Sequence, residues 1–297
     1  MIHPMLCRTW EDAPPHPNQY PVYVQPKLDG IRCIVTLTKT HLGRELEAHS
    51  RGGKPLVLPF HIERSLIDFY TNEKNWNVVL DGELYAHGLS FQEVASRIKR
   101  VKHGTHPDVA VIRYAVYDIV EENMTYAHRK EWLDRAIPNQ DGEKDPVYHL
   151  LAFYSADEND VSLYHDWCVD NGFEGSIIRL PGGKYEQGKR SKNLLKRKDW
   201  KDEDFEIVNV EEGVGKNSGT AVLRLEIPLK DGECRDGFAV QQFTVTAPGN
   251  YTEKAAVWDH RDEILATAHV CTVKYQELTD DGIPRFPVAL GIKEKGT

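Results

Sequence analysis

The chain lacks the features that mark membrane and secreted proteins. No apolar run in its 297 residues approaches the length of about 18 residues that a membrane-spanning helix needs, and the mean hydropathy is −0.53. The first residues contain no basic patch followed by an apolar stretch, so they do not form a secretion signal. We therefore expect a cytoplasmic protein that does not enter a membrane.

Cysteine is scarce, and its spacing excludes two common uses. The five cysteines are scattered, and no two of them form a Cys-x-x-Cys pair; they are Cys7, Cys33, Cys168, Cys234 and Cys271. An odd number without paired spacing argues against a disulfide framework and against a structural zinc site.

An overall excess of positive charge is also absent, because the formal net charge is −9. Such a balance would weigh against a nucleic-acid partner if the charges were evenly mixed. They are segregated: residues 184–201 contain two acidic residues and eight basic ones, Lys184, Lys189, Arg190, Lys192, Lys196, Arg197, Lys198 and Lys201. A second basic cluster consists of Arg97, Lys99, Arg100, Lys102 and His103. A basic run by itself fits a solvated face or an import signal as well as it fits a nucleic-acid contact.

Hydrophobic periodicity predicts a mixed α+β fold. Residues 31–37 alternate and predict a half-buried strand that directs Arg32 away from its apolar face. Further strands are predicted over 78–85, 111–119, 176–180 and 194–198. Helices are predicted around Ile62/Leu66/Phe69, Val94/Ile98/Val101 and 130–137. After residue 200, short strands, glycine-rich turns and one helix near 255–266 predict a small β-barrel.

The strongest motif is Lys27-Leu28-Asp29-Gly30-Ile31-Arg32, which resembles motif I of the covalent nucleotidyltransferases, the superfamily of DNA ligases, RNA ligases and mRNA capping enzymes. Five further stretches resemble the later motifs in the same order. They are Ser50-Arg51-Gly52-Gly53, Leu80-Asp81-Gly82-Glu83-Leu84, Tyr114-Ala115-Val116-Tyr117-Asp118, Glu174-Gly175-Ser176-Ile177-Ile178-Arg179 and Leu194-Leu195-Lys196-Arg197-Lys198. Six collinear matches are far more specific than one.

The resemblance implies that Lys27 attacks the α-phosphate of ATP and carries AMP. A free lysine has a pKa of about 10.4, so the site has to depress that value. We expect a bound metal and the cations Lys196 and Lys198 to do so. Because these two lysines are two residues apart, one strand face would present both of them to the same phosphate.

The resemblance also implies roles for the other motif residues. Glu174 would bind Mg²⁺ or Mn²⁺, and Glu83 would contact the metal or the ribose. Tyr117 would stack on adenine, Arg32 would bind the ribose and later a nick phosphate, and Arg51 would bind the 5′-phosphate of the nick. The tyrosine hydroxyl has no assigned role. The implied catalytic set is Lys27, Asp29, Arg32, Glu83, Glu174, Lys196 and Lys198. The implied nucleotide-binding set is Gln25, Pro26, Lys27, Leu28, Arg32, Glu83, Tyr117, Lys196 and Lys198. The expected DNA contacts are Arg32, Arg51, Arg97, Lys99, Lys189, Arg190, Lys192 and Lys216.

The domain plan implied by the resemblance is an adenylyltransferase domain over residues 1–200, with ATP-grasp-like antiparallel sheets and helices, followed by an OB-fold barrel over 201–297. The barrel would rotate about residue 200 to clasp DNA, and its loop 213–219 would reach backbone phosphates. The last family motif has its nearest candidates in Pro284-Arg285-Phe286-Pro287 and Gly291-Ile292-Lys293-Glu294-Lys295, where lysine stands in place of arginine.

These features favour a minimal, monomeric ATP-dependent DNA ligase that seals 3′-OH/5′-phosphate nicks in duplex DNA. An NAD-dependent ligase is disfavoured because only 26 residues precede Lys27 and no zinc pattern exists. An mRNA capping guanylyltransferase remains an alternative, although Leu28 stands where threonine is usual. An RNA ligase of the same superfamily and a non-catalytic OB-fold nucleic-acid binder also fit parts of the sequence.

Overall fold

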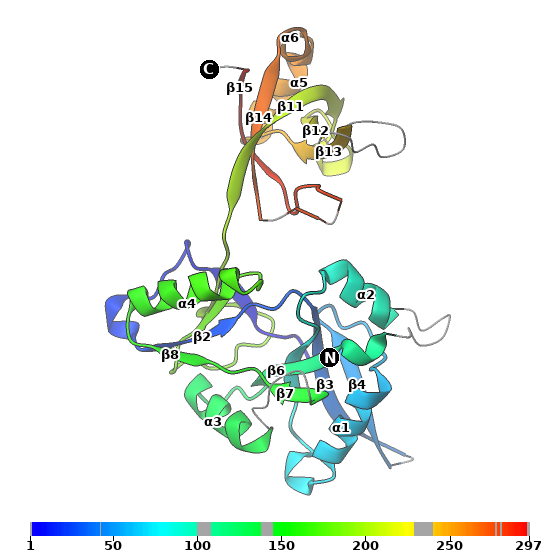
Figure 1. Ribbon diagram of the computed structural model, residues 1–297, viewed down its shortest axis with the longest axis vertical. Coiled ribbons are helices and arrows are strands. Elements are labelled where there is room, and N and C mark those ends of the chain that lie inside the picture. The colour runs from blue at the N-terminus through cyan, green and yellow to red at the C-terminus, as the bar shows by residue number, and fades with distance from the viewer. Residues whose placement is uncertain are drawn as a thin grey trace. The chain divides into compact units, whose positions relative to one another are not determined.

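The computed structural model describes residues 2–41, 43–99, 108–137, 145–228, 240–276, 278–279 and 281–295. The chain divides into two compact units, residues 1–198 and residues 199–297, which are described separately below (Figure 1). No helix in the described ranges has both the length and the apolar character that crossing a membrane requires.

The first unit is built on two five-stranded sheets. The strand order of the first sheet is β4 (Gly43–Ser50), β3 (Ile31–Thr40), β5 (Leu80–Tyr85), β6 (Arg113–Ile119) and β7 (Val147–His149). The order of the second sheet is β1 (Leu6–Thr9), β10 (Arg190–Arg197), β9 (Ser176–Arg179), β2 (Val22–Pro26) and β8 (Phe153–Ser155).

Neighbouring strands are mostly antiparallel, but each sheet contains one parallel pair. These pairs are β6 with β7 and β1 with β10. The expectation of antiparallel sheets therefore holds only in part. In both parallel pairs a long stretch of chain separates the partners, so no hairpin turn imposes an antiparallel direction on them.

Helices cover one side of each sheet. The first sheet packs against α1 (Phe60–Tyr70), α2 (Phe91–Lys99) and α3 (Tyr126–Ala136), which contribute Ile62, Leu66, Val94, Ile98 and Leu133 to its core. Helices α1 and α2 confirm two of the predicted helices, although Val101 of the second lies outside the described residues. Helix α3 confirms the third but begins at Tyr126 rather than at residue 130. The second sheet packs against α4 (Glu158–Asp170), which lies along β2, β8 and β9.

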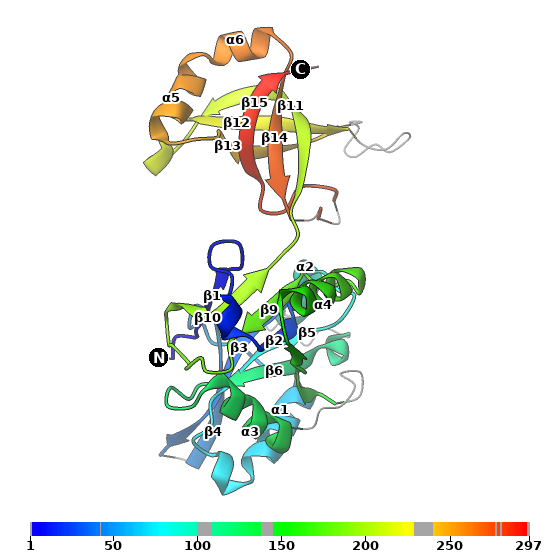
Figure 2. The ribbon, with the colours of Figure 1, turned by 90° about the vertical axis from the view of Figure 1, so that its left-hand side faces the viewer.

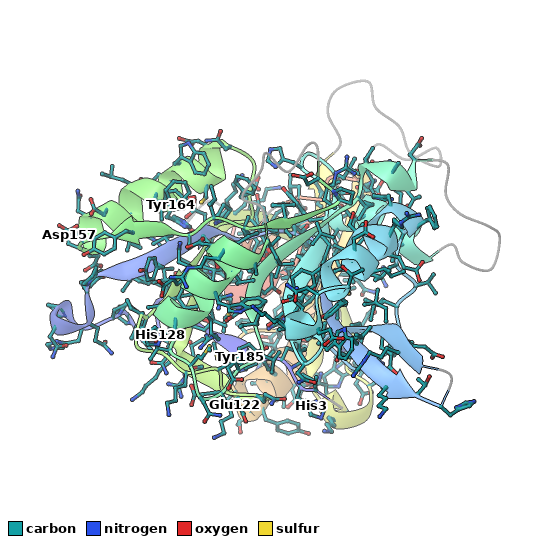
Figure 3. The ribbon with its side chains drawn as sticks, turned by 90° about the horizontal axis from the view of Figure 1, so that it is seen from below. His3, Glu122, His128, Asp157, Tyr164 and Tyr185 are labelled. Carbon is teal, nitrogen blue, oxygen red and sulfur yellow. The ribbon has the colours of Figure 1, made fainter. Side chains whose placement is uncertain are left out.

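Helix α4 was not predicted, and its sequence explains why. Its buried face consists of Val161, His165 and Cys168, so a polar residue occupies the middle of the apolar stripe. His165 is accommodated because its Nδ1 lies 2.9 Å from the Ser176 hydroxyl. Asp157, labelled in Figure 3, caps the start of the helix, and its carboxylate accepts the backbone N–H of Asp160 at 2.9 Å.

Strand β3 is buried more deeply than its alternating pattern predicts. Cys33, Ile34 and Val35 are all buried, although Ile34 lies on the face opposite the other two. The reason is its place in the sheet: β4 and β5 flank it, and protein covers both faces at its centre.

The second unit contains one five-stranded sheet of antiparallel neighbours (Figure 2). Its order is β13 (Val240–Thr246), β12 (Ala221–Pro228), β11 (Lys201–Glu212), β14 (His269–Tyr275) and β15 (Val288–Glu294). Within the described ranges, no ladder joins the two outer strands into a closed barrel.

Two helices, α5 (Tyr251–Asp259) and α6 (Arg261–Ala266), replace the single helix predicted near 255–266. The chain turns at His260, where φ −96° and ψ 14° leave the helical region. Short 3₁₀ turns complete the two units at Pro17–Gln19, Glu73–Asn75, Val109–Val111 and Gly215–Asn217.

Candidate active site

Lys27 lies where the chain passes from the second sheet to the first, between β2 and β3. Its backbone is held on both sides: the Lys27 N–H donates to the Gly175 carbonyl at 2.8 Å, and the Glu174 N–H donates to the Lys27 carbonyl at 3.1 Å. Gly175 has φ +141°, and a Cβ there would lie 2.3 Å from the Arg197 carbonyl oxygen. Glycine is therefore required where the segment carrying Glu174 approaches the end of β10.

The Glu174 carboxylate binds two lysines. One oxygen pairs with the Lys27 ammonium and the other with the Lys198 ammonium. The side chains of Lys27, Lys198 and Glu174 are 21%, 10% and 8% exposed. The reactive amine is thus held by a nearly buried anion but remains accessible to solvent.

This arrangement corrects two expectations about Lys27. The charge nearest to its amine is the Glu174 carboxylate, whereas the sequence predicted cations there, a bound metal with Lys196 and Lys198. Lys196 and Lys198 also do not share a strand, because β10 ends at Arg197. Lys196 lies opposite Ile177 of β9 and forms no ion pair within the described ranges, while Lys198 lies beyond the strand and reaches Glu174.

Arg32, Asp81 and Glu83 share one face of the first sheet. Arg32 on β3 is the cross-strand partner of Glu83 on β5, and Asp81 lies two residues along β5 on the same face. Arg32 donates from Nε to Asp81 at 2.9 Å and from Nη2 to Asp81 at 2.6 Å. Its Nη1 donates to the Met5 carbonyl at 2.8 Å. Burial disfavours the charged guanidinium, but Asp81 outweighs this effect and raises the pKa of Arg32.

Glu83 is a half-buried carboxylate whose charge is only partly compensated. Burial raises its pKa from the ordinary 4.5 to about 7, although the cations of Lys27 and Arg32 oppose the shift. Tyr117 on β6 donates its hydroxyl to Glu83 at 3.2 Å. Burial holds the pKa of this phenol well above its ordinary value, so it keeps the proton it donates. The Tyr117 hydroxyl, which has no role in the sequence analysis, thus orients Glu83.

The acidic groups can contribute to a divalent metal site but do not form a complete one. Within the described part of the chain, no cluster of three or more His, Cys, Asp or Glu side chains is arranged to hold a metal ion. Glu174 and Glu83 supply hard oxygen donors, and the raised pKa of Glu83 shows a carboxylate that a cation would relieve. This donor set fits Mg²⁺, which commonly binds one or two carboxylates together with substrate phosphates and water.

Four further residues of the predicted site, Gln25, Pro26, Leu28 and Asp29, adjoin Lys27 in the chain. Gln25, Pro26 and Leu28 lie on β2 or in the same junction as Lys27, and Leu28 packs in a cluster that includes Tyr117. Asp29 belongs to the same junction. A Cβ on the next residue, Gly30, would lie 2.4 Å from the Leu84 carbonyl oxygen, which explains the glycine in motif I.

The basic residues expected to bind DNA occupy several elements. Arg51 is exposed in the turn after β4, and Arg97 on α2 is half-buried with its Nη1 3.8 Å from Glu93. Lys99 ends α2, and its side chain lies outside the described part, as do Arg100, Lys102 and His103. Lys189, Arg190 and Lys192 are exposed around the start of β10, the strand that leads to Lys198.

In the second unit, Lys216 is exposed in the 3₁₀ turn after β11. The two lysines near the C-terminus that were matched to the last family motif pair with acidic residues of β11. Lys293 lies 2.7 Å from Asp204, and Lys295 lies 2.6 Å from Glu206. In this structure they therefore hold β15 to the unit's own sheet.

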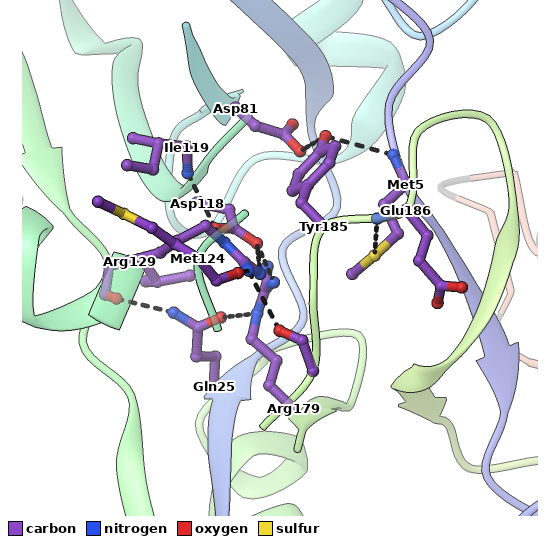
Figure 4. A network of polar contacts seen from close by, with 12 residues as sticks. Met5, Gln25, Asp81, Asp118, Ile119, Met124, Arg129, Arg179, Tyr185 and Glu186 are labelled. Carbon is purple, nitrogen blue, oxygen red and sulfur yellow. Dashed lines mark hydrogen bonds and ion pairs between the residues drawn. The ribbon is translucent and has the colours of Figure 1, made fainter. Parts of the chain in front are cut away.

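Several buried residues around the site have no role in the sequence analysis. Asp81, Asp118 and Arg179 occur in quoted motifs without an assigned role, whereas their partners Tyr185 and Arg129 lie outside the motifs. Figure 4 shows this network of polar contacts. A sequence pattern that could reveal this network is a charged residue inside a strand whose other residues are apolar and buried. Such a buried charge requires a partner elsewhere in the fold.

The comparisons with known proteins agree with this geometry. The family model of the ATP dependent DNA ligase domain matches residues 4–198, which include every residue described above in the first unit's site. The chain belongs to the ATP-dependent DNA ligases. It is 25% identical over 308 aligned residues to the DNA ligase of African swine fever virus (isolate Pig/Kenya/KEN-50/1950), covering 99% of this chain and 69% of the viral one.

Solved structures resemble this ligase in fold. A Lig E DNA ligase, described as binding DNA with a minimal scaffold, has a TM-score of 0.71 at 21% identity and covers 99% of this chain and 100% of its own. The structure Pmar-Lig_PreS3 has a TM-score of 0.79 at 19% identity and covers 98% of this chain and 67% of its own. Membership in the family implies that this enzyme uses ATP and a divalent metal ion to seal nicked DNA.

Proposed function

We propose that this ligase joins a 3′-hydroxyl to a 5′-phosphate in nicked duplex DNA through a covalent AMP on Lys27. The observation that carries the proposal is the convergence of Lys27, Glu174 and Lys198 at the junction of the two sheets, with Arg32, Glu83 and Tyr117 on the facing sheet. Residues 1–200 would form the adenylation domain.

The chemistry proceeds in three transfers. Lys27 loses a proton, its Nζ forms a bond to the α-phosphorus of ATP, and the bond to pyrophosphate breaks. The 5′-phosphate of the nick then displaces Lys27 and takes the AMP. Finally the 3′-hydroxyl attacks that phosphate, a new phosphodiester forms, and AMP leaves.

The chain's residues would divide this work by their geometry. Lys198, which shares Glu174 with Lys27, would bind the phosphates, and Lys196 would assist from β10. Arg32, held in a fixed orientation by Asp81, would contact the ribose, and the ring of Tyr117 would stack on adenine. Glu174 and Glu83 would hold Mg²⁺, which neutralises charge on the phosphates when bound.

The second unit, residues 201–297, would be an OB-fold that clasps the DNA. The sheet of this unit has five strands, and neighbouring strands are antiparallel. This supports the assignment, since the OB-fold is a partly open five-stranded barrel. Lys216 in this unit, and Lys189, Arg190 and Lys192 on the first, would contact phosphates. The enzyme would act as a monomer.

Incubation with α-labelled ATP tests the adenylation step. The wild-type protein should form an acid-stable AMP adduct with a divalent metal, and Lys27→Ala should form none. The same variant should still seal nicks that carry AMP beforehand, because that step no longer uses the nucleophile. Absence of an adduct from the wild type would overturn the proposal, and an adduct formed equally well from GTP would favour a capping enzyme instead.

Arg51 provides a separate test of the DNA step. It is exposed and forms no ion pair within the described ranges, so its removal should leave the fold and the adenylation rate unchanged. Arg51→Ala should slow nick sealing about tenfold or more, because a charge-assisted bond to the 5′-phosphate is lost. Arg64→Ala, at an exposed position of α1 without an ion pair in the described ranges, is the matched control. Normal sealing by the Arg51 variant would contradict the phosphate-clamp role.

A further inference from the structure

Asp118 is a completely buried carboxylate that binds two arginines. It accepts hydrogen bonds from Arg129 Nε at 2.6 Å and Nη2 at 3.1 Å, and from Arg179 Nη1 at 2.6 Å. It also accepts the Ile119 N–H at 2.9 Å. Figure 4 shows both guanidinium groups meeting at this carboxylate. A charge buried this deeply is tolerable only when it is paired and hydrogen-bonded, and both of its oxygens are occupied.

The two arginines reach Asp118 from different elements. Arg129 lies on α3, is 1% exposed, and also donates from Nη1 to the carbonyls of Met124 at 2.8 Å and Gly183 at 3.1 Å. Arg179 lies on β9 of the second sheet, whereas Asp118 lies on β6 of the first. The cluster therefore connects the two sheets that carry the two halves of the active site.

Arg179 extends the connection to the nucleotide-binding residues. Its Nε donates to the Gln25 side-chain carbonyl at 2.8 Å, and the Gln25 amide donates in turn to the Leu150 carbonyl at 2.9 Å. Gln25 stands two residues before Lys27 on β2. The Arg179 guanidinium carbon also lies 5.5 Å from the centre of the Tyr117 ring, within the range of a cation–π contact.

We propose that Arg129 is a positioning residue for nucleotide binding. It fixes Asp118, Asp118 fixes Arg179, and Arg179 holds the Gln25 amide and the Tyr117 ring in the orientation that the purine base of ATP meets. This inference rests on the proposed adenylation by Lys27. Arg129 itself contacts Asp118, two carbonyls and the rings of Tyr126 and Tyr185, and its shortest connection to the base runs through Asp118 and Arg179.

The substitution that separates positioning from folding is Arg129→Met. Methionine fills a similar volume and removes one positive charge, which leaves Asp118 and Arg179 as a matched pair of opposite charges. Asp118 would keep the hydrogen bonds from Arg179 and Ile119 but lose the two bonds from Arg129 that set its orientation. Arg129→Lys keeps the charge but cannot reproduce the planar fork. Arg135→Met is the matched control, since Arg135 lies on the same helix and is 74% exposed.

The experiment measures formation of the Lys27 adduct against ATP concentration, normalised to the folded fraction of each variant. Arg129→Met should raise KM for ATP about tenfold and change kcat by less than about threefold, because the loss falls on binding of the base. Arg129→Lys should show an intermediate KM, and Arg135→Met should match the wild type. Sealing of nicks that already carry AMP should change less than adenylation.

The outcomes are separable. A wild-type protein that forms no adduct refutes the proposed function itself. With an active wild type, an unchanged KM in Arg129→Met, accompanied only by a lower melting temperature or a lower kcat, shows that Arg129 is purely structural and overturns this inference. If Arg129→Met does not fold, Arg129→Lys is judged by the same criterion, and a wild-type KM in that variant overturns the inference.

Discussion

Two carboxylates in the first unit each bind two cations, but the cations differ. Glu174 binds Lys27 and Lys198 in the candidate active site, and both lysines are partly exposed to solvent. Asp118 binds Arg129 and Arg179 inside the unit, where the arginine side chains are 1% and 5% exposed. One carboxylate bound by two cations therefore occurs once in the candidate active site and once in the buried interior of the first unit.

The chemistry of the two cation types accounts for the difference. An ammonium is a point charge on a flexible stem and can lose its proton, so a lysine pair can be rearranged when phosphates and metal arrive. A guanidinium stays charged and presents a rigid fork of donors, so an arginine pair fixes geometry. Lysine is found where the charge must change during reaction, and arginine where it must not.

The largest effect on stability is expected from neutralising the buried carboxylate. Asp118→Asn leaves two buried guanidinium groups without an anion and should lower the free energy of unfolding by about 3–5 kcal/mol. Glu174→Gln should cost only about 1–2 kcal/mol, because Lys27 and Lys198 can extend toward water. Urea unfolding of both variants measures the difference. Equal losses would break the contrast between a rigid and a rearrangeable cluster.

Exchanging the cation types is expected to have a smaller effect. Arg179→Lys cannot bind Asp118 and Gln25 simultaneously, so it should lower the free energy of unfolding by about 1–3 kcal/mol. Lys198→Arg keeps the charge and needs to bind only Glu174, so it should lower the free energy of unfolding by less, about 1 kcal/mol. Urea midpoints for both variants test this expectation. A tolerated Arg179→Lys would show that the fork geometry is not required.

Substitution of Glu83 has the smallest expected effect, which appears as a dependence of the free energy of unfolding on pH. The pKa of Glu83 is about 7 in the folded protein and close to the ordinary 4.5 after unfolding. Between these values the unfolded chain releases the proton while the folded protein keeps it. The stability contributed by Glu83 is therefore fully present below pH 4.5 and lost as pH rises through about 7.

The variant Glu83→Gln should remove this part of the pH dependence, about 1–2 kcal/mol after allowance for partial exposure of the group. Melting temperatures between pH 4.5 and 8 in metal-free buffer provide the measurement. His149 supplies an internal comparison, because burial lowers its pKa from 6.5 to about 4. Lowering the pH from 6.5 toward 4 therefore destabilises the fold through His149. A profile that is identical for wild type and Glu83→Gln would rule out the assigned shift.

Motif spacing located the residues now found around Lys27, and the folded chain brings Glu174, Glu83, Arg32 and Tyr117 into its neighbourhood. Short-range periodicity likewise predicted α1 and α2, but only the part of α3 from residue 130 on, because its first turns carry the buried Arg129. It missed α4, where His165 interrupts the stripe, and it predicted one helix where His260 separates two. Periodicity fails where a polar residue is buried by a partner that lies elsewhere in the chain.

The sequence by itself determined the family of this ligase and the kind of cofactor, and it identified Lys27 as the nucleophile that we propose, because these depend on residue types at short, fixed spacings. Only the tertiary structure decided which carboxylate contacts Lys27, that Lys198 and not Lys196 shares it, and that Asp118 joins Arg129 to Arg179. The physical reason is that pairing between strands and helices distant in sequence sets these contacts, and no local pattern encodes which buried charge will meet which.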